Sequence, residues 1–120
     1  RIQGFDGRPD LFEGKTHPRK AVGHPNIYFD TLVHDTDSLK LMIERQGSNQ
    51  VIMGLDDPYP LGEMESDAQS SYPGKLLDLA IERNLINEKQ YHEIWEDNTL
   101  RWLFGEDEQA KKNLIDKILS

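Results

Sequence analysis

Cysteine is missing from this 120-residue sequence. The chain therefore offers no disulfide framework, no thiolate metal ligand and no cysteine nucleophile. No apolar run approaches the roughly 20 residues that a membrane-spanning helix needs, and the first residues do not have the pattern of a signal peptide. Basic residues are scarce, since 14 lysines and arginines stand against 22 acidic residues and give a formal net charge of −8. We therefore expect an acidic cytoplasmic protein that binds neither nucleic acid nor membrane.

The four histidines lack the spacing of a metal site. Neither an H-x-H nor an H-E-x-x-H pattern occurs in the sequence, so this chain is not expected to hold zinc by itself. His34 follows a predicted strand, and for its imidazole a metal-ligand role, a hydrogen-bonding role and a packing role all stay open.

The rest of the sequence divides into four segments. Residues 1–25 contain seven glycines and prolines, which preclude long regular elements and predict a loop with basic residues. Residues 26–60 predict a strand over 26–33, a short helix over 38–46 and a second strand over 51–56, a βαβ unit with parallel strands. Asp35, Thr36 and Asp37 are predicted to cap the start of the helix. Residues 61–74 form a polar connection. Residues 75–120 predict C-terminal helices, over 75–83, 88–96 and 107–119. Asn87 and Gln90 predict a capping box at the start of the second of these helices.

The second strand begins an apolar run that ends in two aspartates and two prolines. Successive side chains of a strand alternate between its faces, so one face carries Val51, Met53 and Leu55 and the other carries Ile52, Gly54 and Asp56. The apolar face suits packing under helices, and Asp56 then stands at the carboxyl end of the strand. Catalytic groups collect at that end in a barrel of parallel strands. A solvated turn residue is the other interpretation of Asp56.

Several motifs resemble one known family. Residues 1–11 (RIQGFDGRPDL), 28–41 (YFDTLVHDTDSLKL) and 54–63 (GLDDPYPLGE) are similar to segments of the 2-amino-3-carboxymuconate-6-semialdehyde decarboxylase-like members of the amidohydrolase superfamily. Residues 98–104 (NTLRWLF) look like the closing helix of that family. Two positions depart from the family pattern: Leu55 replaces a small hydroxyl residue, and Asp57 replaces an aromatic one.

The resemblance implies an α/β fold, the C-terminal part of a (β/α)8 TIM-type barrel of the metal-dependent hydrolase kind. A complete barrel of this type needs about 250 residues. Residues 1–120 are therefore expected to be the C-terminal portion of one barrel domain, with the remaining part of the barrel as their partner.

The resemblance also implies a carbon–carbon lyase, a metal-dependent non-oxidative decarboxylase. Asp56 is then the metal ligand and the catalytic residue of this chain, holding Zn or alternatively Mn with further ligands upstream. Arg1 and Arg8 would bind a small carboxylate substrate, which is a carboxylated muconate semialdehyde or an aromatic acid. A homo-oligomer is implied too, because the arginine at the position of Arg1 comes from the neighbouring subunit in dimeric members.

Two other functions stay open. A hydrolase or hydratase of the same superfamily would use the same carboxylate. A non-enzymatic small acidic α/β interaction domain would leave Asp56 as a solvated turn residue. The roles of Asp57 and of residues 105–120 are open as well.

Overall fold

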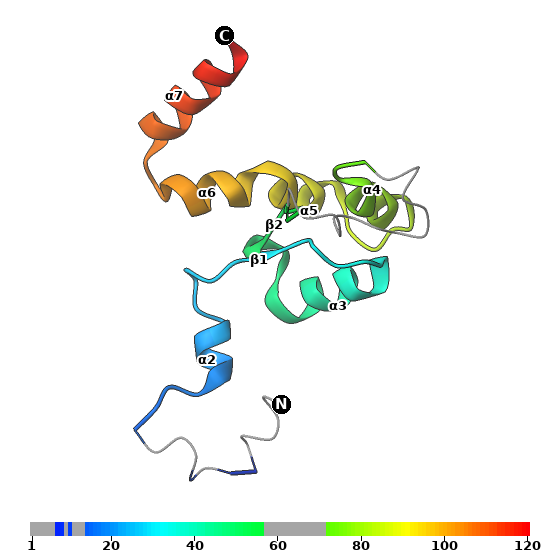
Figure 1. The fold of residues 1–120 in the computed structure, drawn as a ribbon, viewed down its shortest axis with the longest axis vertical. Coiled ribbons are helices and arrows are strands. Elements are labelled where there is room, and N and C mark those ends of the chain that lie inside the picture. Colours follow the sequence, from blue (N-terminus) through cyan, green and yellow to red (C-terminus); the bar gives the residue numbers. More distant parts are fainter. Residues whose placement is uncertain (1–6, 9, 11–13, 57–71) are drawn as a thin grey trace.

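The structure is a computed structural model that describes residues 7–8, 10, 14–56 and 72–120 (Figure 1). Its two strands are β1 (Phe29–Asp30) and β2 (Val51–Ile52). Its helices are α2 (Pro18–Val22), α3 (Thr36–Gln46), α4 (Lys75–Glu82), α5 (Glu88–His92), α6 (Asn98–Phe104) and α7 (Glu108–Leu119). A 3₁₀ turn over Ser48–Gln50 leads into β2, and a π-helical turn over Glu93–Asp97 joins α5 to α6.

The strands β1 and β2 pair in parallel, with Phe29 opposite Val51 and Asp30 opposite Ile52. Helix α3 lies between them in the chain, so the predicted βαβ unit is present. Both strands are much shorter than the predicted ranges of 26–33 and 51–56. A ladder extends only as far as both partners run side by side, and here the pairing ends one residue later, where the Thr31 amide donates to the Ile52 carbonyl at 3.0 Å.

Helix α3 is held at both ends by its own sequence. The Asp35 side chain caps it by accepting hydrogen bonds from the amide and the hydroxyl of Ser38, at 2.8 and 2.7 Å. The hydroxyl bond is the largest cause that lowers the pKa of Asp35. Gly47 ends the helix with a φ of +86°, a conformation that glycine adopts without strain. Because Asp35 caps the helix, α3 begins at Thr36, two residues before the predicted start.

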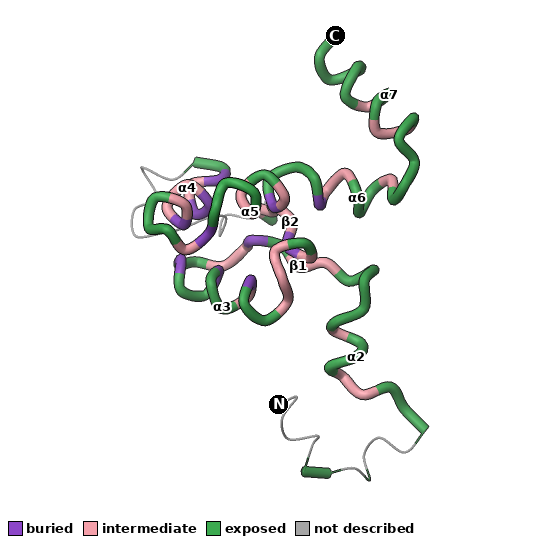
Figure 2. Tube along the Cα trace, turned by 180° about the vertical axis from the view of Figure 1, so that it is seen from behind, coloured by how far each residue is buried: buried purple, intermediate pink, exposed green. Residues whose placement is uncertain are grey.

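The hydrophobic core lies where α3, α4 and the π-helical turn meet β2 (Figure 2). Its buried members are Leu39, Ile43, Val51, Leu76, Leu77, Ala80, Ile86 and Ile94. Val51 is fully buried and Met53 packs against the cluster, as the predicted alternation along β2 requires. The helices thus cover the Val51 face of the strand pair.

A carboxylate bridges two aromatic residues beside this core. The hydroxyls of Tyr91 and Tyr72 donate to the two oxygens of Asp78, each at 2.8 Å. The bond to this anion is the main cause that raises the pKa of Tyr91 to about 12, because losing the phenolic proton would place two negative charges together. The ring of Tyr91 also stacks on Trp95 with centroids 6.3 Å apart. The bridge therefore joins α4 to α5.

The C-terminal helices cover the edge of β2 that β1 leaves open. The capping box predicted at Asn87 is present, with Gln90 as its partner. Further along, the Met53 amide donates to the Ile94 carbonyl at 3.0 Å, and the Asn98 side chain donates to the Val51 carbonyl at 2.6 Å. In this structure the helical segment thus satisfies the backbone groups that a further strand would pair with, and closing a barrel at this edge would require a strand to replace these contacts.

Helices α2 and α7 have no buried residues. α2 lies within the segment predicted to be a loop. It forms because Pro18 suits the first turn of a helix and the His17 ring accepts from the Arg19 amide at 3.1 Å. α7 extends away from the rest of the chain and contacts α6 (Figure 1).

In the part of the chain that the structure describes, no helix combines the length and the apolarity that crossing a membrane requires. The same residues form two parallel strands flanked by helices, which is an α/β arrangement. They supply a part of the predicted fold.

Candidate functional site

The carboxyl ends of β1 and β2 place polar residues on the face opposite the core. Residues paired in a parallel ladder project to the same side of the sheet, so Asp30 shares a face with Ile52 and, two residues on, with Gly54. None of these three belongs to the core cluster. Asp30 is exposed, whereas Thr31, on the other face, is fully buried. This open face therefore carries the polar groups that could form a site.

Thr31, the residue that follows β1, connects β1 to the segment that follows β2 by hydrogen bonds. Its hydroxyl oxygen accepts a hydrogen bond from the Gly54 amide at 3.2 Å. The hydroxyl lies 3.4 Å from the Gly54 carbonyl oxygen and 3.3 Å from the Met53 sulfur, either of which can take its proton. A buried threonine thereby continues the strand pairing through its side chain and fixes Gly54 beside β1.

Asp56 follows two residues later, exposed and beyond the end of β2. Its φ is +55°, the left-handed region that aspartate tolerates better than most residues. The strand alternation that holds at Val51 and Met53 therefore does not extend to Asp56, and strand geometry does not support its predicted place on the face of Ile52 and Gly54. Within the described residues no hydrogen bond or ion pair engages its carboxylate, which leaves the oxygens available to a ligand.

The Asp56 carboxylate could serve as one ligand of a metal ion. Carboxylate oxygen at a strand end is a ligand type that both Zn and Mn accept. Among residues 7–8, 10, 14–56 and 72–120, however, no group of three or more histidines, cysteines, aspartates or glutamates could hold a metal ion. His34 is exposed beside the cap of α3. Asp56 could supply one ligand, and the others would have to come from residues outside those described.

Of the two arginines predicted to bind a substrate carboxylate, the structure describes Arg8. Arg1 lies outside the described residues, as does Asp57. Arg8 is exposed and forms a forked ion pair with Asp10, with nitrogen–oxygen distances of 2.8 and 2.7 Å. This bond raises the pKa of Arg8 and lowers that of Asp10. A substrate carboxylate would have to replace Asp10 on the guanidinium.

The side chains of Asn98 and Arg101, which we call the polar clamp, hold the start of β2 by hydrogen bonds. The fully buried Asn98 donates through Nδ2 to the carbonyls of Ser48, at 2.7 Å, and Val51, at 2.6 Å. Its Oδ1 accepts from Arg101, whose guanidinium also reaches the Asn49 carbonyl at 2.7 Å. The resemblance places residue 98 in a closing helix and implies a structural role for its asparagine, without naming its partners. The three polar partners of Asn98, which are Ser48, Val51 and Arg101, become known only from the contact between β2 and α6 in the structure.

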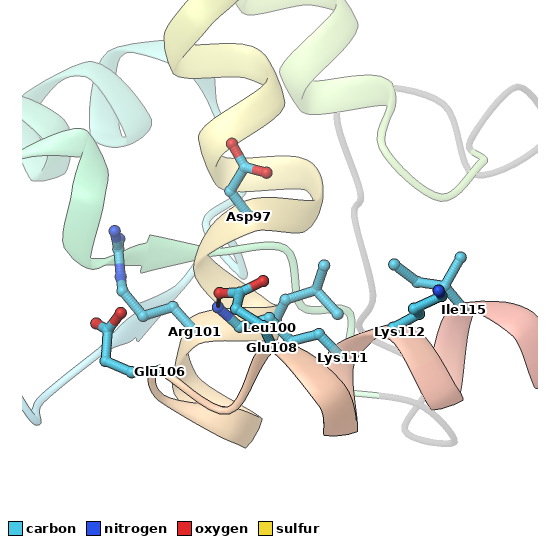
Figure 3. Close-up of a pocket in the computed structure, with 8 residues that line it drawn as sticks. All are labelled: Asp97, Leu100, Arg101, Glu106, Glu108, Lys111, Lys112 and Ile115. Carbon is cyan, nitrogen blue, oxygen red and sulfur yellow. Dashed lines mark hydrogen bonds and ion pairs between the residues drawn. The ribbon is translucent and has the colours of Figure 1, made fainter.

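The cavity drawn in Figure 3 lies away from these strand ends, between α6 and α7. It measures about 570 Å³ and its charges are mixed, because Arg101, Lys111 and Lys112 alternate with acidic side chains. The Lys111 ammonium is already paired with Glu108 at 2.6 Å. Such a lining favours no one ligand charge, so the cavity has no part in the proposal below.

No protein-family model matches the chain. Two curated proteins do, and both are named 2-amino-3-carboxymuconate-6-semialdehyde decarboxylase. The one from Dictyostelium discoideum is 36% identical over 77 residues, which are 62% of this chain and 19% of that protein. The one from Caenorhabditis elegans is 42% identical over 64 residues, 52% of this chain and 16% of that protein. The chain is a distant relative of these decarboxylases, which confirms the resemblance, and the matches span less than a fifth of either relative.

Proposed function

We propose that the protein carrying this chain is a metal-dependent non-oxidative decarboxylase, and that the chain supplies the C-terminal part of its (β/α)8 barrel. The observation that carries the proposal is the parallel pair of strands with Asp56 just beyond the carboxyl end of β2, in a chain related to decarboxylases. In open and closed parallel sheets alike, ligands bind at the carboxyl ends of the strands.

Asp56 is the residue of this chain that would hold the metal, Zn or alternatively Mn, together with ligands from elsewhere in the protein. A metal bound there would supply a Lewis acid that polarises a substrate oxygen or activates water. Arg1 and Arg8 would bind the carboxylate of the substrate through charge-assisted hydrogen bonds. The Thr31 and Asn98 contacts hold the segment that leads to Asp56 in place.

The names of the relatives and the two arginines support the proposed substrate class. Both relatives carry a name that specifies a carboxymuconate semialdehyde, so we propose that compound or an aromatic acid of similar size. We also propose that the protein works in the cytoplasm as a homo-oligomer, an arrangement in which Arg1 of one subunit serves the site of another.

Carbon dioxide release is the direct test. The purified protein is incubated with 2-amino-3-carboxymuconate-6-semialdehyde before and after chelation, and again after Zn or Mn is restored. We expect release that stops on chelation and returns with the metal. Substrate loss without carbon dioxide would instead indicate hydrolysis or hydration at the same site. No reaction and no bound metal would favour the non-enzymatic interaction domain.

A further inference from the structure

A cavity of about 490 Å³ lies between the turn that precedes β1 and the carboxyl end of α6. Tyr28 stands directly before β1 and lines this cavity together with Arg101, Trp102 and Glu106. The cavity therefore lies at the amino ends of the strands, whereas Asp56 lies beyond their carboxyl ends. Its volume is in the range of sites that hold small molecules, about 300–1,000 Å³.

Arg101 brings a positive charge to this cavity, and hydrogen bonds hold it in place. Its Nε donates to the Tyr28 hydroxyl at 3.2 Å, and its Nη2 donates to the Asn49 carbonyl at 2.7 Å and to the Asn98 side chain. All three acceptors are uncharged. A guanidinium carries five N–H donors, and among the residues that the structure describes no group accepts from Nη1 and no carboxylate pairs with Arg101. The Nη1 donors and the positive charge therefore remain for a ligand.

Glu106 brings the opposite charge to the same cavity and does not pair with Arg101. The two side chains extend in the same direction in Figure 3. Glu106 is exposed, and within the described part of the chain its carboxylate makes no hydrogen bond or ion pair. Two aromatic side chains, Tyr28 and Trp102, line the cavity as well, and Trp102 is 55% exposed. A large exposed ring stabilises a complex when a ligand covers it.

We propose that this cavity is a binding site for an α-amino acid with an aromatic side chain. The carboxylate of the ligand accepts from Arg101, and its ammonium group donates to Glu106. The ring of the ligand packs against Tyr28 and Trp102. Glu106 would repel a simple anion and Arg101 a simple cation, whereas a zwitterion pairs with both through charge-assisted hydrogen bonds. The site is separate from the proposed metal ligand Asp56 and does not depend on the proposed function.

The test compares three ligands that carry the same ring. Binding of L-phenylalanine, 3-phenylpropanoate and 2-phenylethylamine to the intact protein is measured by calorimetry, because the second lacks the ammonium group and the third lacks the carboxylate. We expect L-phenylalanine to bind about tenfold more tightly than either of the others, equivalent to about 1.4 kcal/mol. Glu106→Gln should lower the affinity for L-phenylalanine by about tenfold, and it should not lower the affinity for 3-phenylpropanoate.

Two controls locate the site. Asp116→Asn, a charge change on exposed α7, should leave the affinity for L-phenylalanine as in the wild type, and so should removal of the metal by chelation. Equal binding of the three ligands, no binding of L-phenylalanine, or an unchanged affinity in Glu106→Gln would each overturn the inference. Loss of binding on chelation would place the amino acid at the metal and would overturn it too. The proposed function fails separately, when the wild type holds no metal or releases no carbon dioxide.

Discussion

Replacing Asn98 by alanine tests how the start of β2 is held. The side chain is fully buried and makes hydrogen bonds to Ser48, Val51 and Arg101. Alanine removes all three. The Val51 residue is fully buried as well, so water cannot readily replace the lost donor at its carbonyl.

The expected loss follows from the burial of each partner. An unsatisfied buried carbonyl costs about 1–3 kcal/mol, and a hydrogen bond whose partner can turn to water contributes about 1 kcal/mol. Ser48 is half-buried and Arg101 is exposed, and Arg101 keeps its bond to the Asn49 carbonyl. We therefore expect Asn98→Ala to lower the free energy of unfolding by about 3 kcal/mol, a large share of the roughly 5–15 kcal/mol typical of a domain.

The assay is urea unfolding of the intact protein followed by circular dichroism. Asn113→Ala is the matched control, because Asn113 is exposed on α7 and accepts one hydrogen bond among the described residues, from Gln109 at 2.8 Å. That variant should change the free energy of unfolding by less than about 0.5 kcal/mol. Equal stability of the two variants would refute the clamp as a structural support of β2.

Three further outcomes are expected. Gly74→Ala should lower the free energy of unfolding by about 2–4 kcal/mol, since its φ is +89° and a new Cβ would lie 2.6 Å from the Trp95 ring; Gly14→Ala, at φ +71° with open space, should cost only the backbone part. Ultraviolet titration should show Tyr91 ionising near pH 12. Because the pKa of Tyr91 is raised in the folded protein, its hydrogen bond to Asp78 stabilises the fold fully below pH 10, and this stabilisation is lost as pH rises to about 12. A Tyr91→Phe variant with an unchanged alkaline unfolding profile would contradict this expectation. Arg1→Ala should lower kcat/KM by about tenfold or more without changing the melting temperature.

The sequence predicted the local features well because each has a local cause. The alternation that buries Val51 and Met53, the cap at Asp35 and the capping box at Asn87 all depend on residues within a few positions of each other. Helix α2 escaped prediction, since its cap is His17, a residue type that is not among the usual N-caps.

Features that depend on contacts between distant segments could not be read from the sequence. The strands stop early because their length is set by pairing, and the left-handed backbone at Asp56 ends the alternation on which its inward direction was predicted. The Thr31–Gly54 contact needs the register of β1 against β2. The predicted roles of Arg1 and Asp57 lie outside the described residues and stay predictions.

The most direct test of the account is the metal content of two neighbouring variants, measured by elemental analysis beside turnover. Asp56→Asn should lose most of the bound metal and at least about a hundredfold in activity, the usual order for disturbing a ligand or its support. Asp57→Asn should keep its metal and most of its activity. Loss of metal from Asp57→Asn, with Asp56→Asn still loaded and active, would contradict the assignment of Asp56 as the metal ligand.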